Sequence, residues 1–318
     1  MILQTKVILK KEVRNPISYT SKIVLLGSCF SENIGNQLNH FKFQTVQNPF
    51  GILFHPKAIK ELVANAIHEK TYTENDLVFQ NKRWHCFDTH SKLSAVLKKN
   101  VLLQVNKATS STNTALKEAT HLVITLGTSW VYRYTETNTI VANCHKIPQK
   151  KFTKELLSVQ EVTETLVEII TLIQSVNASI NVIFTVSPVR HLKDGFVENT
   201  QSKSHLIAGI QTLLNATNNN NLHYFPSYEI MMDELRDYRF YAEDLIHPNT
   251  TAIQYIWERF VATWMDEKAS DTMQEINTIQ KGLLHKPFHE NSEQHQRFLT
   301  NLSTKITKIE RDFSFIKF

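Results

Sequence analysis

Short apolar runs alternate with longer helical patterns along most of this chain, and this alternation restricts its fold more than any other feature. Helical patterns lie near residues 31–40, 56–69, 92–108, 155–176 and 200–217. The apolar runs between them lie at 23–26, 43–46, 122–126, 182–186 and 222–225. This order is typical of βαβ units with right-handed crossovers. It predicts an α/β fold built on a five-stranded, mainly parallel sheet covered by helices on both faces.

Three segments depart from the alternation. Residues 76–87 and 130–142 each contain a turn between two strand-like stretches, and we expect hairpin insertions there. From about residue 251 the pattern is helical, and after Pro287 it becomes polar, which predicts a C-terminal helical arm. We therefore expect one α/β domain over residues 1–268 and a helical extension over 269–318.

Composition excludes several classes of protein. An apolar fraction of 42% is enough for a large core, and the net charge of +5 is spread along the chain rather than gathered into a stripe for nucleic acid. The apolar stretches are shorter than a membrane span, and the N-terminal sequence lacks the layout of a signal peptide. The three cysteines lack C-x-x-C spacing. We expect a cytoplasmic protein with free thiols and with neither a nucleic-acid nor a membrane partner; the oligomeric state stays open.

The first apolar run ends in Gly27-Ser28-Cys29, directly before a helical pattern. Ligands bind at the carboxyl ends of strands in open α/β sheets, so Cys29 is a candidate nucleophile. A helix N-terminus lowers the pKa of a thiol from about 8.5. Two alternatives stay open: a cysteine that only fills space, and Ser28 as the nucleophile. We expect Ser31 to cap the helix.

A second motif, Asp244-Leu245-Ile246-His247, places an acid three residues before an imidazole. A carboxylate at this spacing can orient the ring and stabilise its protonated form. Pro248 stiffens the segment, and Asn249 offers a cap for the following helix. The two motifs together predict Cys29 as nucleophile, His247 as base and Asp244 as the orienting acid.

Further polar residues lie in the predicted loops. Cys86 and Cys144 each adjoin a histidine, but neighbouring residues of a strand point to opposite faces, so we predict no metal site. Phosphate-binding glycine motifs are missing from the sequence, and we expect no cofactor. We expect these loops to wall the active-site cleft. The candidate substrate contacts are Ser28, Asn48, Asp88, His90, Asn143, His145, Arg190 and His191.

This layout resembles the SGNH (GDSL-type) hydrolase superfamily, and the sequence Gly27-Ser28-Cys29-Phe30 resembles the GSCFA family named after that motif. Residues 48–51, 126–130, 187–191 and 244–247 extend the resemblance over residues 21–250. It implies a flavodoxin-like three-layer α/β/α sandwich, with Cys29 in place of the superfamily's serine. It also implies an oxyanion hole formed by the N–H groups of Cys29 and Gly51, with Ser129 where an asparagine is expected.

The predicted function is that of an SGNH-like esterase or acyltransferase with a Cys-His-Asp triad. Its substrate is expected to be an acyl ester of a small or carbohydrate-like molecule. Cysteine keeps acyl transfer feasible and shifts the balance toward transfer through a thioester. The alternative is a catalytically inactive SGNH-like module that binds a ligand or glycan.

Overall fold

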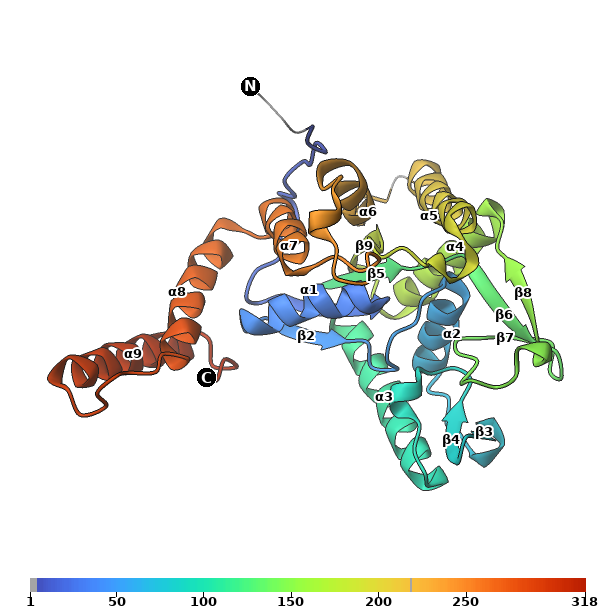
Figure 1. Cartoon of the computed structure of the whole chain (residues 1–318), viewed down its shortest axis with the longest axis horizontal. Coiled ribbons are helices and arrows are strands. Elements are labelled where there is room, and N and C mark those ends of the chain that lie inside the picture. The colour runs from blue at the N-terminus through green and yellow to red at the C-terminus, as the bar shows by residue number, and fades with distance from the viewer. Residues whose placement is uncertain (1–4, 218) are drawn as a thin grey trace.

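Five parallel strands form the centre of the computed structural model, which describes residues 5–217 and 219–318 (Figure 1). The expectation that the N-terminal sequence is not a signal peptide rests partly on residues 1–4, which lie outside the described residues. Across the sheet the strands are β10 (Leu222–Tyr224), β9 (Asn181–Val186), β5 (His121–Leu126), β1 (Lys22–Gly27) and β2 (Gln44–Gln47). Taken in chain order, this is the flavodoxin-like order 2-1-3-4-5. Every residue of β5 and β9 is buried, as strands covered on both faces require.

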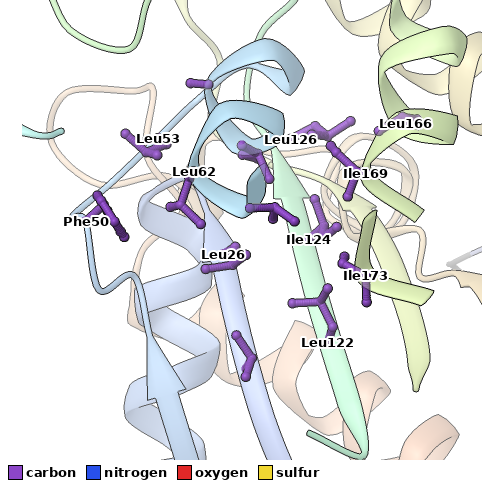
Figure 2. Packing of buried hydrophobic residues seen from close by; sticks show 14 of the residues in the cluster. Leu26, Phe50, Leu53, Leu62, Leu122, Ile124, Leu126, Leu166, Ile169 and Ile173 are labelled. Carbon is purple, nitrogen blue, oxygen red and sulfur yellow. The ribbon is translucent and has the colours of Figure 1, made fainter. Parts of the chain in front are cut away.

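Helices cover both faces of this sheet and confirm the predicted three-layer fold. One face packs against α2 (Pro56–Ile67), α3 (Lys98–Glu118), α4 (Val159–Val176) and α5 (Phe196–Ala216). Figure 2 shows side chains of β5 and α4 facing one another within this core. The other face packs against α1 (Cys29–His40) and α7 (Thr250–Trp264), and residues of α8 (Glu267–Leu283) continue this core beyond the sheet. Alternate residues of β1 serve the two cores, since successive side chains of a strand point to opposite faces.

Both predicted hairpins are present beside the sheet. The strands β3 (Leu77–Gln80) and β4 (Arg83–Cys86) pair antiparallel, as do β6 (Trp130–Tyr134) and β7 (Thr139–Val141). A third strand, β8 (Phe152–Leu156), pairs with β6 where we expected a helix from residue 155. That helix, α4, begins only after Ser158, whose side chain and that of Glu161 form a capping box.

The prediction of a helix over 92–108 was wrong at both ends, because α3 spans Lys98–Glu118. The second half of α3 is rich in Ser, Thr and Asn, a composition that is typical of loops. Thr109 and Thr112 instead donate hydrogen bonds to the carbonyl oxygens of Val105 and Ala108, at 3.0 and 2.7 Å. Their hydroxyls are thereby satisfied within the helix, and both side chains can be buried.

The C-terminal arm consists of α8 and α9 (Glu293–Asp312), and Figure 1 shows it extending away from the sheet. Lys308 bridges the two helices through an ion pair of 2.8 Å with Glu275. The predicted boundary between residues 268 and 269 falls in the first turn of α8. None of the helices that the structure describes is long and apolar enough to cross a bilayer.

Shorter helical turns complete the chain. They are α6 (Ser227–Glu229), a π turn at Ile230–Glu234, and 3-10 turns at Glu74–Asp76, Ser91–Leu93, Gln149–Lys151, Leu192–Asp194 and Tyr238–Phe240.

Candidate active site at the carboxyl edge of the sheet

Cys29 is the first residue of α1 and directly follows the exit from β1. Gly27 makes that exit possible: its φ is +133°, and a Cβ there would lie 2.1 Å from the carbonyl oxygen of Thr125. The cap of α1 is Ser28, whose Oγ accepts the N–H of Phe30 at 3.3 Å, so the predicted cap at Ser31 was wrong. The Ser31 hydroxyl lies inside the protein and donates to Thr125 Oγ1 at 2.8 Å.

Ser28 is fully buried, which removes it as a substrate contact and as an alternative nucleophile. Cys29 is partly exposed. Burial raises the pKa of the Cys29 thiol, while the Lys203 ammonium and the N–H groups of Cys29 and Phe30 act in the opposite direction. The expected effect of the helix N-terminus is therefore present, but desolvation outweighs it, and the resting sulfur is protonated at neutral pH.

The loop before α7 holds Asp244 and His247 in direct contact. The Nδ1 atom of His247 lies 2.6 Å from Asp244 Oδ2, and both side chains are about half exposed. Asp244 Oδ1 also accepts the N–H groups of Ile246 and His247, at 2.9 and 3.0 Å. These bonds lower the pKa of Asp244 to about 2. Asn249 caps α7 as expected, and its Oδ1 accepts the N–H of Ala252 at 3.0 Å. The carboxylate therefore favours the tautomer with a proton on Nδ1, and Nε2 makes no hydrogen bond with residues 5–217 or 219–318.

Arg190 holds this loop in place. Its guanidinium donates to the carbonyl oxygen of Leu245 at 2.7 Å and lies 4.8 Å from the ring centre of Tyr241. Leu245 has a φ of +55°, an uncommon backbone conformation for a branched residue. Arg190, predicted as a substrate contact, thus interacts with the protein itself and stabilises the loop that carries His247.

His191 follows β9, and its ring packs edge-on against Phe54. Burial, Lys203 and His247 together lower the pKa of His191 to about 3, so its ring is neutral. Its Nε2 atom is buried and has no hydrogen-bond partner in residues 5–217 and 219–318. Charge effects on pKa values connect Cys29 with Lys203, and His191 with both Lys203 and His247. In the described chain, no hydrogen bond joins the Cys29 sulfur to the His247 ring directly.

The three expected oxyanion donors differ in their surroundings. Cys29 begins α1, where helix N–H groups lack helical partners. Gly51 has a φ of +76° and packs against His90, which leaves no space for a Cβ. The Gly51 N–H donates to the carbonyl oxygen of Asn48 at 2.7 Å. Ser129, expected to be an oxyanion donor, is instead fully buried, and its hydroxyl lies 3.1 Å from both the carbonyl oxygen and the Oγ of Ser202.

Asn48, which we expected to contact the substrate, lies beside the exit from β1. The Oδ1 of Asn48 accepts the N–H of Gly27 at 2.9 Å, so the side-chain Nδ2 points away from Gly27. That Nδ2 is buried and lacks a hydrogen-bond partner in the described part of the chain. A buried amide with spare donors at this place is suited to binding an oxygen atom of a ligand.

Three other predicted contacts belong to the hairpins instead. His145 is buried, stacks on His85, and bonds to the carbonyl oxygen of Cys86 at 2.7 Å and to Ser91 Oγ at 3.0 Å. Asn143 accepts the N–H of His145 at 2.9 Å. The His145 ring and the Asn143 Oδ1 thus form hydrogen bonds inside the protein.

Asp88 accepts hydrogen bonds from the Tyr72 hydroxyl at 3.0 Å and from Lys70 at 3.3 Å. It lines an open cavity of about 850 Å³ between α2 and the two hairpins, and Cys29, Asp244 and His247 are not among the residues that line it. The expectation that Asp88 walls the active-site cleft was therefore wrong. No group of three or more His, Cys, Asp or Glu side chains is placed to hold a metal ion among the residues that the structure describes.

Sequence reasoning missed Lys203 of α5. It is 1% exposed, and its Nζ donates to the carbonyl oxygens of Gly127 and Ser187 at 2.7 and 2.8 Å. The sequence contained one signal: Lys203 lies three and seven residues before Leu206 and Ile210, so it shares a helical face with them. In the structure this face of α5 is buried. A lysine on an inward face has a buried charge, and such residues are candidates for function.

Comparison with curated protein sequences gives no match. Among solved structures, a carbohydrate esterase family 3 protein from Talaromyces cellulolyticus matches at 8% identity with a TM-score of 0.37, covering 81% of this chain and 99% of that chain. An acetyl xylan esterase (Est2A) from the rumen bacterium Butyrivibrio proteoclasticus matches at 10% identity with a TM-score of 0.37, covering 79% and 64%. These two likenesses are too weak to support a conclusion about this protein. The family model "GSCFA domain protein, C-terminal domain" matches residues 276–318. The GSCFA family model matches residues 22–260, which is most of the sequence, and the protein belongs to the GSCFA family.

Proposed function

We propose that this protein transfers acyl groups, as an esterase or an acyltransferase, with Cys29 as nucleophile. The observation that carries the proposal is the Asp244–His247 pair, 2.6 Å apart and half exposed, in a chain that also presents a partly exposed cysteine at a strand exit. An oriented imidazole and a partly exposed thiol are the groups that acyl transfer requires. The resemblance of the Gly-Ser-Cys and Asp-x-x-His motifs to the SGNH superfamily supports the same chemistry.

The chemical roles follow from the environment of each group. His247 Nε2 takes the proton from Cys29 Sγ, the sulfur attacks the acyl carbon, and the protonated ring then gives its proton to the leaving oxygen. Because burial keeps Cys29 protonated, a base beside it is needed. Water or an acceptor hydroxyl subsequently attacks the thioester, which releases the thiol. Asp244 stays charged throughout and orients the ring.

The developing oxyanion would be bound by backbone N–H groups. We assign this role to Cys29 and to Gly51, whose N–H would exchange the Asn48 carbonyl for the substrate. The unpartnered Nδ2 of Asn48 and Nε2 of His191 are the proposed side-chain contacts, with His90 beside Gly51. The exposure of Asp244 and His247 leaves room for a large leaving group, which supports an acyl ester of a small or carbohydrate-like molecule.

A second candidate is a non-catalytic module that binds a ligand or glycan. Two observations favour it: the raised pKa of Cys29 and the missing direct hydrogen bond between its sulfur and His247 in the described chain. In that case the unpartnered polar atoms of Asn48 and His191 would serve binding alone.

An ester screen separates the two candidates. Aryl esters of increasing acyl length are given to the wild type, Cys29→Ser, Cys29→Ala and the control Cys144→Ala, whose sulfur is partly exposed in another region. We expect turnover by the wild type and the control, reduced turnover by Cys29→Ser and none by Cys29→Ala. Equal turnover by all four proteins would exclude Cys29 as nucleophile. A complete lack of turnover, with equal binding of an acetylated oligosaccharide by wild type and Cys29→Ala, would favour the binding module.

A further inference from the structure

Lys203 is a fully buried lysine at the edge of the sheet where the proposed nucleophile lies. Two of its three N–H donors bond to the carbonyl oxygens of Gly127, just after β5, and Ser187, just after β9. These bonds satisfy two donors of Lys203 and two carbonyl oxygens, but they do not by themselves explain why a positively charged side chain is buried here. A buried ammonium is costly unless an anion or a set of dipoles compensates it.

The register of the sheet places this cation level with Cys29. Gly27 of β1 pairs with Thr125 of β5, and the N–H of Ser28 donates to the Thr125 carbonyl at 3.0 Å. Cys29 and Gly127 each lie two residues beyond that paired position on neighbouring strands. Since Lys203 Nζ lies 2.7 Å from the Gly127 oxygen, the ammonium and the sulfur occupy the same end of the sheet.

We propose that Lys203 is a positioning residue whose buried charge stabilises the thiolate of Cys29. The inference rests on the proposed role of Cys29 and deepens it. When His247 removes the proton from Sγ, the sulfur anion is left beside a cation that is already in place and needs no movement. The thiolate in turn favours the charged form of Lys203, so the ammonium supports the nucleophile without exchanging a proton in the step.

Other groups around the pair act more weakly or in the opposite direction. Glu32 of α1 opposes the thiolate, and His191 and His247 approach from the loops after β9 and before α7. The ring of Tyr228, in α6, lies 5.5 Å from Lys203 Nζ. Among these, Lys203 and Cys29 stabilise each other's charged forms.

This mutual effect has a measurable signature. Burial lowers the pKa of Lys203 to about 7 and raises that of Cys29, and the charge of each group counteracts the effect of burial on the other. Two coupled groups lose their protons in steps that belong to the pair. The thiolate fraction should therefore rise with pH in two stages, because the help from Lys203 fades as the lysine loses its charge.

The test measures alkylation of Cys29 by iodoacetamide in the full chain between pH 5 and 10, with the modified peptide quantified by mass spectrometry. Lys203→Gln keeps two N–H donors for the two carbonyl oxygens but removes the charge. Lys60→Gln, on α2, is the matched control, because its lysine pairs with Glu61 and is 28% exposed. We expect Lys203→Gln to alkylate about tenfold more slowly at pH 7 and in a single stage, which corresponds to a pKa shift of about one unit. The wild type and Lys60→Gln should show two stages.

Identical profiles for the wild type and a folded Lys203→Gln would show that the lysine only ties β5 to β9. If the variant does not fold, the wild-type profile still decides, because a single-stage rise would overturn the proposal. The readout does not depend on ester turnover. Failure of the ester screen alongside a two-stage profile would therefore reject the proposed function and leave the thiolate pair standing.

Discussion

Two polar regions of this protein contain residues that the sequence marks as candidates for function, and they differ in how their hydrogen bonds are satisfied. In the hairpin region, His85, His145, Asn143 and Asp88 each bond to another part of the protein. At the carboxyl edge of the sheet, Asn48 and His191 have buried polar atoms without partners in the described chain, and His247 presents a ring to solvent.

We use this difference to distinguish polar residues that stabilise the fold from polar residues that could bind a ligand. A buried polar group that is fully bonded stabilises its own fold and has nothing left to offer a ligand. A buried group with a spare donor or acceptor is tolerated where a ligand supplies the missing bond. The comparison predicts that mutations at the sheet edge lower activity, whereas those in the hairpin region lower stability.

The largest effect is expected from His247→Ala. Removal of the base should lower kcat/KM for the ester found in the screen by about 10²–10⁴-fold. The variant should fold normally, because the side chain is half exposed. Steady-state kinetics beside the exposed control His289→Ala would measure the effect. Undiminished turnover by His247→Ala would remove the base from the mechanism.

A stability test addresses the hairpin region. Burial lowers the pKa of His145 to about 4, below the ordinary value of about 6.5 expected for the unfolded chain. The unfolded state therefore binds more protons between these pH values, so the stability that neutral His145 gives is complete above about pH 6.5 and is lost as pH falls toward 4. His55 and His191 act in the same direction.

The free energy of unfolding should fall when the pH is lowered from 7 to 5. We expect this fall to be about 1–2 kcal/mol smaller in His145→Asn than in the wild type. Asparagine suits the left-handed backbone at this position, where φ is +49°. Urea unfolding at both pH values would measure it, with turnover at pH 7 unchanged. An equal pH dependence in variant and wild type would contradict the assignment.

A smaller effect is expected from Arg190→Ala, which frees the loop around Leu245. Displacement of His247 should lower kcat/KM by about tenfold, since small errors in position reduce catalysis. Limited proteolysis should cut the variant between residues 242 and 248 faster than the wild type. Faster proteolysis without a loss of turnover would mean that loop order is unrelated to catalysis.

Ser129→Ala should have the smallest effect. Loss of an oxyanion donor typically costs about 10²–10³ in kcat, but this hydroxyl is bonded to Ser202 inside the protein. We expect kcat within about threefold of the wild type. A loss of a hundredfold would return Ser129 to the oxyanion site and weaken the distinction between satisfied and unsatisfied groups.

Periodicity predicted the parts of the fold that depend on local burial. The buried runs of β5 and β9 and the turn between β3 and β4 were found where expected. The ends of α3 and the strand β8 were missed. Threonines can be satisfied within a helix when that face is buried, and an edge strand is determined by its partner rather than by its own residues.

The site was predictable to a similar extent. The sequence placed Cys29 at a strand exit and Asp244 within reach of His247, because spacing along the chain controls both relations. The sequence could not predict the hydrogen-bond partners of Arg190, His145 and Ser129, because each bonds to residues far away in the sequence.

The sequence by itself determined the sheet, its two helical layers and the two motifs at its edge, because these follow from apolar spacing, glycine geometry and short-range hydrogen bonding. Only the tertiary structure decided which polar side chains of the described chain retain unpaired donors and that Lys203 lies buried at the carboxyl edge of the sheet. Burial and charge compensation depend on what packs around a residue, and segments distant in the chain supply those neighbours.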